Sequence, residues 1–381
     1  MVGASLARAL AGSGLSVAVV EAVSRDAPGQ PSYDDRVIAL AWGGRLILEA
    51  MGRWSAIEPE AEPIRRIHIS DRGHFGFARL DHREQGVPAL GYVVSARAIG
   101  RGLLEGIDDQ ERLDWICPAR IADFRVEPER VLATLEVDGG QRQVGARLLV
   151  AADGGDSPIR QRLDLPLQEW NYGHTAVIAN LTPGEPHGGV AYERFTDSGP
   201  LAVLPMSEGR CSLVWTQRDD AVQEILALDD AVFLQRLQGR FGFRLGRLAR
   251  VGRRAAYPLR LMRVKEMVRP RLVLIGNAAH TLHPVSGQGF NLGLRDVAEL
   301  AQVLVRANEE RLDPGAAAVL ESYAARRAGD QHRVALVTDF LARLFINPLP
   351  PVRLARNLGL LAMDLMPPVK RGLTRRFMGM R

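Results

Sequence analysis

The chain has 381 residues, a formal net charge of +5, 46% hydrophobic residues and two cysteines. A chain of this length can bury about two cores without disulfide support. Cys117 and Cys211 belong to no CxxC or His/Cys ligand pattern, which argues against a structural metal and favours a reducing compartment. No apolar run reaches the ~18 residues that cross a bilayer, and no signal-peptide pattern opens the chain. We therefore expect a cytoplasmic protein.

Positive charge is concentrated at the C-terminal end. Residues 353–381 carry seven basic residues against one acidic residue, Asp364, so this segment has a net charge of +6 and the rest of the chain is near −1. The basic residues are Arg353, Arg356, Lys370, Arg371, Arg375, Arg376 and Arg381. Beside the apolar stretch 358–366, this tail could attach to an anionic membrane surface at the inner face of the membrane. The alternative is a solvated helical tail. Nucleic-acid binding is not expected, because no exposed aromatic residues alternate with the basic ones.

The first part of the chain alternates helical and strand patterns. A helical run over residues 4–10 stops at Gly12. Residues 15–20 then form a continuous apolar run that ends at Glu21 and is typical of a buried parallel strand. Further predicted elements are helices over 44–52 and 97–107 and three strands between 120 and 150, with a turn at Gly139 and Gly140.

From residue 170 to residue 259 the pattern changes to alternating strands, such as 201–204 and 211–215, with one helix at 230–241. We interpret this stretch as a second domain. Residues 271–275 return to the buried parallel-strand pattern before a Gly-rich turn. Helices are expected over 291–306, 316–345 and 352–366, with Pro348, Pro350 and Pro351 breaking the last two apart. The sequence thus predicts an α/β protein.

Gly3 and Glu21 have the spacing of two positions in a dinucleotide-binding unit. The last glycine of a GxGxxG turn lets helix and strand pack closely, and an acidic residue about 20 positions later accepts hydrogen bonds from ribose hydroxyls. The sequence starts at Met1, without the first two glycines and the strand before them, so we expect a chain that is short at its N-terminus. An ordinary helix-start glycine and a surface glutamate are the alternative interpretation.

A second turn between a strand and a helix carries Asp153, Gly154 and Arg160. Glycine permits close backbone approach, Asp153 can hold a ribose or nearby backbone, and Arg160 can meet phosphate charge. The alternative is a turn with a capping aspartate and a solvated arginine.

A third segment runs from Gly276 and Asn277 through several glycines to a helix start. Such a helix N-terminus presents unpaired N–H groups and a partial positive charge, which suit an anionic ring or a phosphate. His280 and His283 lie in this segment, but without a carboxylate or cysteine nearby in sequence they are a weak metal pattern. Packing histidines are the alternative.

In this order, the three segments resemble the fingerprints of flavoprotein monooxygenases of the p-hydroxybenzoate hydroxylase type. The chain is similar to the ubiquinone-biosynthesis hydroxylases along essentially its whole length. Residues 35–40 match an entry segment whose arginine, Arg36, lies near the flavin in that family, and Arg97 matches an arginine near the FAD diphosphate. The family pattern at the third segment is Gly-Asp. The Asn277 that stands here resembles the 2-polyprenyl-6-methoxyphenol hydroxylase branch, as do residues 356–360, and its amide can still hydrogen-bond the ribityl chain.

The resemblance implies a discontinuous Rossmann-like FAD-binding domain with a parallel sheet over residues 1–65, 91–165 and 260–330. A substrate domain with a mixed or antiparallel sheet is expected over 66–90 and 166–259, and a helical region over 331–381. The expected cofactor-binding residues are Gly3, Glu21, Arg36, Arg97, Asp153, Gly154, Arg160, Gly276, Asn277, Gly287, Gln288, Gly289 and Asn291.

The implied reaction is hydroxylation of a prenylated phenol in ubiquinone biosynthesis. FAD would be reduced by NAD(P)H and react with dioxygen to give a flavin hydroperoxide that attacks the ring. N–H groups at Gly287 and Gln288 would stabilise the anionic reduced ring, and Pro284 would shape the site where oxygen reacts. The base that deprotonates the phenol is open; His174, His187 and Tyr192 lie in the expected substrate domain, where structural roles are the simpler interpretation.

Three alternatives stay open at this stage. A flavin-dependent reductase or a halogenase could use the same scaffold, although no Trp-containing halogenase fingerprint is found. A non-catalytic member of a membrane-associated biosynthetic complex is the third. In each case other ubiquinone-biosynthesis proteins are candidate partners.

Overall fold

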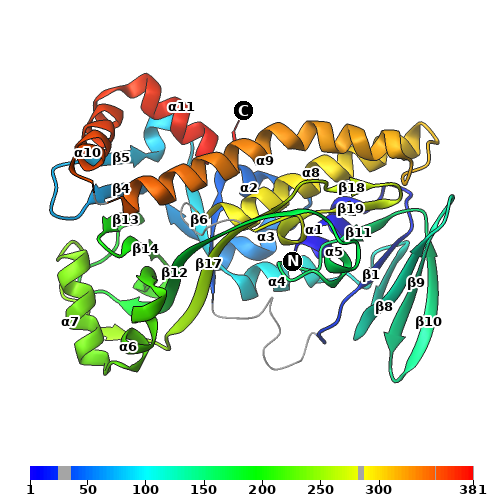
Figure 1. The fold of residues 1–381 in the computed structure, drawn as a ribbon, viewed down its shortest axis with the longest axis horizontal. Helices are drawn as coiled ribbons and strands as arrows, with labels where there is room; N and C mark the ends of the chain where they lie inside the picture. Colours follow the sequence, from blue (N-terminus) through cyan, green and yellow to red (C-terminus); the bar gives the residue numbers. More distant parts are fainter. Residues whose placement is uncertain (25–35, 282–286, 348, 381) are drawn as a thin grey trace.

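The computed structural model describes residues 1–24, 36–281, 287–347 and 349–380 and has a mixed α/β fold (Figure 1). A nine-stranded sheet lies at one end and a three-stranded antiparallel sheet at the other, and the long helix α9 (Ala317–Ile346) runs between them. The helices α1 (Val2–Ala9) and α8 (Gln288–Glu309) pack against each other between the two ends.

The nine-stranded sheet has the order β20-β17-β12-β15-β14-β13-β4-β5, with β16 also paired to β12. All neighbours are antiparallel except β13 and β4, which run parallel. Its strands are β4 (Arg66–Asp71), β5 (Phe77–Asp81), β12 (Leu167–Thr182), β13 (Val190–Thr196), β14 (Gly199–Pro205), β15 (Cys211–Arg218), β16 (Arg250–Val251), β17 (Ala255–Val264) and β20 (His280–Thr281). Helices α6 (Val222–Ala227) and α7 (Asp230–Phe241) cover one face through a buried cluster that includes Trp215 and Phe233.

Outside the nine-stranded sheet, the parallel pairs among the described residues join short strands. The strand β1 (Val17–Val20) pairs with β7 (Leu113–Ile116), and β11 (Leu149–Ala151) pairs with β19 (Leu272–Leu274), which also carries the antiparallel β18 (Val268–Arg269). Two antiparallel sheets complete the strands: β2 (Val37–Ala41), β6 (Gly91–Ser95) and β3 (Glu62–Ile64) form one, and β8 (Ala119–Val126), β9 (Val131–Val137) and β10 (Gly140–Ala146) the other.

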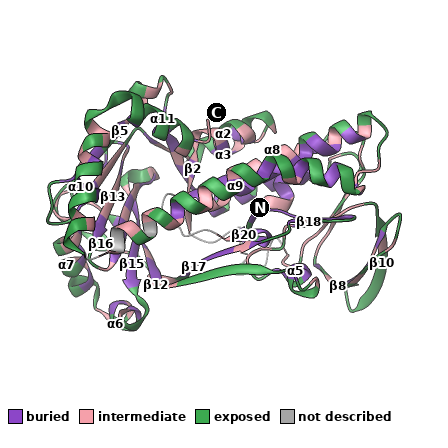
Figure 2. Cartoon of the chain, turned by 45° about the horizontal axis from the view of Figure 1, so that its top comes forward, coloured by how far each residue is buried: buried purple, intermediate pink, exposed green. Residues whose placement is uncertain are grey.

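Helix α8 lies at the centre of the largest core. Its apolar residues pack with α1, β19 and the first part of α9 in one buried cluster, while the outward face of α9 stays exposed (Figure 2). Helices α2 (Trp42–Ala50), α3 (Trp54–Ile57) and α4 (Ala96–Leu104) form a second cluster beside β2 and β6. Helix α5 (Pro158–Arg162) follows the turn after β11. The start of α8 is therefore held from several sides.

The expected α/β class is confirmed. The two parallel strands expected at 15–20 and 271–275 are β1 and β19, and the helix expected at 230–241 is α7. Helix α8 begins at Gln288, three residues earlier than expected. The domain boundaries stay predictions; β4 and β5 join the nine-stranded sheet, while α9 runs without a break across residue 330.

The break expected between the two helices is confirmed, since α9 ends at Ile346 and α10 (Pro350–Leu365) starts with Pro350 and Pro351 as its first two residues. Proline fits the first turn, where its missing N–H would have no partner within the helix. Pro367 likewise starts a further helix, α11 (Pro367–Phe377).

The basic C-terminal segment is packed rather than loose. Arg356 of α10 forms a buried ion pair with Asp71 of β4 at 2.7 Å, and Lys370 of α11 pairs with Glu84 at 3.0 Å. The interpretation of this segment as a solvated tail is therefore wrong for these two residues. Helices α10 and α11 form a unit that covers β4 and β5 (Figure 1).

Candidate functional site

The start of α8 has the geometry of an anion site. The residue before the helix, Gly287, has φ +61°, and no side chain of the described residues caps the helix there. A Cβ at Gly287 would lie 2.9 Å from the Cβ of Ala39, so only glycine fits this backbone position without displacing β2. A Cβ at Gly289 would meet no atom of the described residues within 4 Å, which leaves space among them beside the first turn. The first turn of this 22-residue helix thus presents N–H groups that no described side chain caps.

Asn291 fixes this helix start to β2. Its Oδ1 accepts the N–H of Ala41 at 2.8 Å, and its Nδ2 donates to the carbonyl oxygens of Ala39 and Gly287, each at 2.8 Å. The side chain, 3% exposed, is fully engaged with backbone. Its contribution to a cofactor site is therefore to position the helix start.

The three segments singled out in the sequence converge beside α1. A Cβ at Gly3 would lie 3.6 Å from Ala152, just before the second segment. Gly276 of the third segment has φ +58° and packs against Val2, where an added Cβ would lie 3.0 Å from the side chain. Because Gly276 has no side chain, the third segment can pack closely against α1.

Arg160 joins the second segment to the third. Its Nη1 donates to the carbonyl of Ala278 at 3.0 Å and its Nη2 to the carbonyl of Gly155 at 2.6 Å. We expected this guanidinium to meet phosphate charge. In the structure this side chain is buried and holds two loops together, and its contact with a phosphate stays a prediction.

The other expected residues of the first and second segments lie near turns. Glu21 directly follows β1 and accepts the N–H of Val23 at 3.0 Å. Asp153 is exposed and caps α5 by accepting the N–H of Ile159 at 3.2 Å, and Gly154 has φ +92°. These positions leave Glu21 and Asp153 accessible to a ligand.

Arg36 and Arg97 lie side by side at the end of the β2–β6 pair. The N–H of Ala96 donates to the carbonyl of Arg36 at 2.8 Å, and Arg97 is exposed in the first turn of α4. The Arg36 guanidinium lies 5.2 Å from the ring centroid of Tyr257 on β17. Arg36 thus stands where the β2–β6 sheet meets the nine-stranded sheet.

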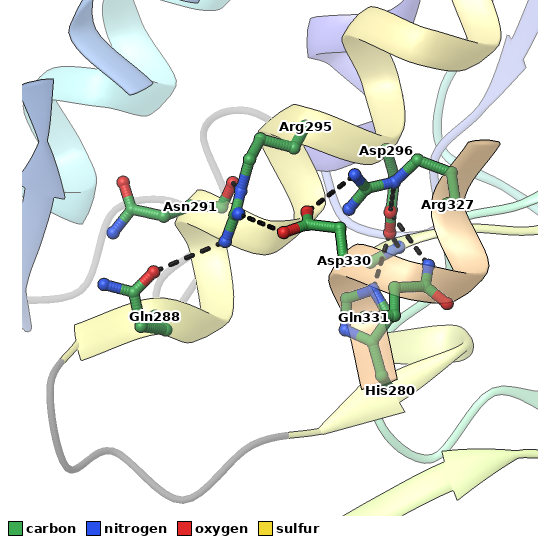
Figure 3. A network of polar contacts seen from close by, with 9 residues as sticks. His280, Gln288, Asn291, Arg295, Asp296, Arg327, Asp330 and Gln331 are labelled. Carbon is green, nitrogen blue, oxygen red and sulfur yellow. Dashed lines mark hydrogen bonds and ion pairs between the residues drawn. The ribbon is translucent and has the colours of Figure 1, made fainter. Parts of the chain in front are cut away.

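A buried polar network lies behind the helix start (Figure 3). The carboxylate of Asp296, on α8, accepts from His280 Nε2 at 2.6 Å, from Arg327 Nε at 2.8 Å and from Gln331 Nε2 at 2.9 Å. It also accepts the N–H of Gly276 at 3.1 Å. Burial alone would raise the pKa of Asp296, but His280 and Arg327 outweigh it and lower the pKa to about 2. One ionised carboxylate therefore ties the third segment to α8 and α9.

The network continues toward the site. Asp330 accepts from Arg327 at 2.7 Å and from Arg295 at 2.8 Å, and Arg295 lies 3.4 Å from Oε1 of Gln288. Gln288 also donates to the carbonyl of Phe377 at 3.1 Å, which links the helix start to α11. The sequence analysis did not find Asp296 or Arg327, since the partners of Asp296 lie 16 or more residues away. The helical position of Asp296 among apolar residues was the one available signal.

The remaining expectations have mixed outcomes. His187 bonds the carbonyl of Met206 at 3.0 Å and His174 that of Tyr172 at 2.6 Å, which fits structural roles. Asn277 is exposed beside the buried Gly276. Pro284 and His283 lie outside the described residues. Within the part of the chain that the structure describes, no group of three metal-binding side chains is found.

These features fit a dinucleotide with an anionic part. The site offers an uncapped helix N-terminus, glycines at close backbone contacts, open space beside Gly289 and two arginines at a neighbouring sheet end. An acidic residue follows a parallel strand, as a ribose requires. The fold and this site define a flavin-nucleotide-binding protein.

Comparison with known proteins gives the family. Residues 1–337 match the family described as "FAD binding domain". Ubiquinone hydroxylase UbiL of Rhodospirillum rubrum is 40% identical over 379 residues, which cover 100% of this chain and 87% of that protein. The 3-demethoxyubiquinol 3-hydroxylase of Escherichia coli is 31% identical over 377 residues, covering 97% of this chain and 94% of that protein. The chain belongs to this family and is an FAD-dependent monooxygenase of the ubiquinone-hydroxylase group.

Solved structures share the fold. The p-nitrophenol 4-monooxygenase PnpA of Pseudomonas putida superposes with a TM-score of 0.81 at 19% identity, covering 100% of this chain and 96% of that chain. PqsL of Pseudomonas aeruginosa superposes with a TM-score of 0.78 at 21% identity, covering 94% of this chain. The resemblance to flavoprotein hydroxylases deduced from the three segments is confirmed.

Proposed function

We propose that this monooxygenase hydroxylates the aromatic ring of a polyprenylated phenol in ubiquinone biosynthesis, with NAD(P)H as reductant and dioxygen as co-substrate. The observation that carries the proposal is the convergence of the three glycine-containing segments beside α1, which packs against α8. The ubiquinone hydroxylases among the relatives support this class of substrate.

FAD supplies the transfer of electrons from NAD(P)H to dioxygen and of one oxygen atom to the ring. The N–H groups from Gly287 to Gly289 stabilise negative charge on the flavin ring, because they point from the positive end of a helix. Arg36 and Arg97 bind the diphosphate side, and Glu21 accepts from the ribose. The Asp296 network keeps the helix start at a fixed distance from the third segment.

The same proposal assigns residues 1–65, 91–165 and 260–330 to FAD binding and 66–90 with 166–259 to substrate binding. The nine-stranded sheet supports grouping residues 66–90 with 166–259, since it unites β4 and β5 with β12 to β15, and it extends into the other part through β17 and β20.

We propose further that the enzyme attaches to the inner face of an anionic membrane through α11, where a prenyl substrate is available. None of the described helices is long and apolar enough to cross a membrane. On α11, Arg371, Arg375 and Arg376 are exposed, and Leu365 and Met366 just before it are 70% and 51% exposed. Exposed apolar residues beside arginines suit an interfacial helix. Other proteins of ubiquinone biosynthesis are candidate partners at the same surface.

The test is a visible spectrum followed by a coupled assay. Purified protein should be yellow, should oxidise NAD(P)H faster when a short-chain prenylated phenol is added, and should place one atom of isotope-labelled dioxygen in the product. A flavin-loaded protein that oxidises NAD(P)H without ever labelling a phenol would contradict the proposed substrate. A colourless protein that is inert to nucleotide would instead favour the non-catalytic alternative.

A further inference from the structure

Glu193 occupies an unusual place on β13. Its neighbours Tyr192 and Arg194 point to the face covered by α7, where the Tyr192 ring makes an edge contact with Phe241 at a centroid distance of 5.4 Å. Because side chains alternate along a strand, Glu193 points to the opposite face together with Ala191 and Phe195. In Figure 1, β13 lies between α7 on one side and α10 on the other.

The two residues that flank Glu193 on this face have different partners. Ala191 belongs to a buried cluster with Val37 of β2 and Val93 of β6. Phe195 belongs to another cluster, with residues of α9 and α10 such as Leu360. Glu193 therefore lies between the β2–β6 sheet and the C-terminal helices.

The same face of β13 packs on β2, and β2 contacts the start of α8. Val37 and Ala39 are two residues apart on β2 and share one face, roughly 7 Å from each other. The intervening Ile38 packs into the separate cluster of α2 and α4. Ala39 is the residue whose Cβ lies opposite Gly287. The face that carries Glu193 thus packs on the strand that seats the candidate flavin-binding helix.

Glu193 has no counter-charge there. Its register partners, Ala202 on β14 and Ile69 on β4, offer no side-chain donor. Among the described residues, no hydrogen bond or ion pair of its half-buried carboxylate is found. Burial alone raises the pKa of Glu193 to about 7. A carboxylate in such surroundings is costly unless a ligand bonds it.

Charged groups on the elements that pack against this face are few among the described residues. Asp71 and Arg356 lie beside Phe195 and neutralise each other in an ion pair. Further charged groups are Arg36 before β2 and Glu62 on β3. On α9, Asp339 and Arg343 form an ion pair with each other. None of them contributes to the pKa shift of Glu193.

We propose that Glu193 binds the phenolic hydroxyl of the aromatic substrate and accepts its proton. In this step the phenol O–H bond breaks, its electron pair stays on the phenolate oxygen, and the proton forms the O–H of the Glu193 carboxyl. No group is oxidised or reduced, and the ring becomes richer in electrons. A base that titrates near neutral pH suits this task. The inference rests on the proposed function, because it takes a phenol as substrate.

The first test measures binding. Flavin-loaded protein is titrated with a short-chain prenylated phenol by calorimetry across neutral pH, comparing wild type, Glu193→Gln and a control, Glu136→Gln. Glu136 is an exposed glutamate on β9. Wild type and control should bind several-fold more tightly above pH 7 than below it, because the ionised carboxylate accepts the hydroxyl. Glu193→Gln should bind with no such pH dependence while flavin content and Tm stay unchanged. A variant that binds as wild type does at every pH would overturn the proposal.

The second test measures turnover. Loss of a general base is expected to lower kcat for hydroxylation by about 100-fold or more. In the pH profile of kcat, the decrease in rate below pH 7 should be absent from Glu193→Gln. Glu193→Asp should restore part of the rate, and phenols already ionised at neutral pH should react almost as fast in Glu193→Gln as in wild type. An unchanged rate and pH profile in Glu193→Gln would refute the assignment. If wild type binds the phenol with the expected pH dependence but never hydroxylates it, the proposed function fails and the binding role of Glu193 stands.

Discussion

His280 and Asp296 form a buried pair in which Nε2 of the histidine lies 2.6 Å from Oδ2 of the aspartate, with side chains 3% and 0% exposed. The same carboxylate accepts from Arg327 and from the backbone of Gly276. One residue of α8 thus sets the spacing between the third segment and α9. The ionised aspartate therefore supports the backbone of the third segment from inside the core.

The first prediction concerns the loss of this charge. Asp296→Asn should destabilise the fold by about 3–5 kcal/mol, because it removes the buried carboxylate that both His280 and Arg327 bond and leaves Arg327 with Asp330 as its remaining counter-ion. Urea unfolding at neutral pH measures this loss. A matched control is Asp330→Asn, whose side chain is 22% exposed and whose replacement should cost less. Equal losses in the two variants would contradict a special role for Asp296.

The second prediction is the pH dependence of the same residue. The Asp296 pKa of about 2 in the folded protein lies below its ordinary value of 3.8. A depressed pKa stabilises the fold at pH values above about 4, and this contribution is lost as pH falls toward 2. It amounts to about 2 kcal/mol at 1.36 kcal/mol per pKa unit. Unfolding free energies measured from pH 5 to pH 2 should therefore fall less steeply for Asp296→Asn than for wild type. Parallel curves would show that Asp296 is not ionised in the folded protein.

The third prediction distinguishes the effect of Gly287 on stability from the effect of Gly289 on FAD binding, both at the start of α8. Gly287→Ala should lower stability by about 1–2 kcal/mol or more, since it adds a left-handed alanine and a contact with Ala39. Gly289→Val should fold with an unchanged Tm but lose FAD, because its side chain enters space that no atom of the described residues fills.

The flavin-to-protein absorbance ratio and a melting curve check both variants. Gly329→Val, at an open helical position on α9, serves as the control and should keep both flavin and Tm. Full flavin content in Gly289→Val would mean that the ring does not approach this turn.

The fourth prediction concerns the C-terminal unit. Arg356→Met should cost about 3–5 kcal/mol and expose α10 and α11 to limited proteolysis, because Asp71 would stay buried with the amide of Asn357 as its remaining side-chain partner. Arg353→Met, a partly exposed position on the same helix, should change neither property. Unaltered proteolysis of Arg356→Met would show that other contacts hold α10.

The fifth prediction tests membrane attachment. Replacing Arg371, Arg375 and Arg376 by glutamine should weaken binding to anionic vesicles by at most ~1 kcal/mol for each arginine, and added salt should remove the difference. Vesicle co-sedimentation measures it, with neutral vesicles and Arg142→Gln, an exposed residue of β10, as controls. Equal sedimentation of all forms at low and high salt would leave α11 as an ordinary solvated helix.

The sequence was sufficient for the features that depend on neighbouring residues. Continuous apolar runs predicted β1 and β19, helical spacing predicted α7, and the order of three glycine segments indicated the flavoprotein family. Each of these signals is local, because strand burial, helix periodicity and backbone freedom at glycine are properties of a short stretch.

The roles of individual polar side chains needed the tertiary structure. Arg160 and Asn291 looked like ligands of a cofactor, yet both bond backbone groups of distant segments. Asp296 and Glu193 looked unremarkable, because what defines them is the surroundings that folding creates. Asp296 gains four donors from three elements, and Glu193 has none among the described residues. The sequence alone indicated the family and placed the three segments proposed to bind the flavin. Only the packing of remote elements decided which charges are neutralised and which one is left for a substrate, since burial and hydrogen bonding depend on residues far apart in the chain.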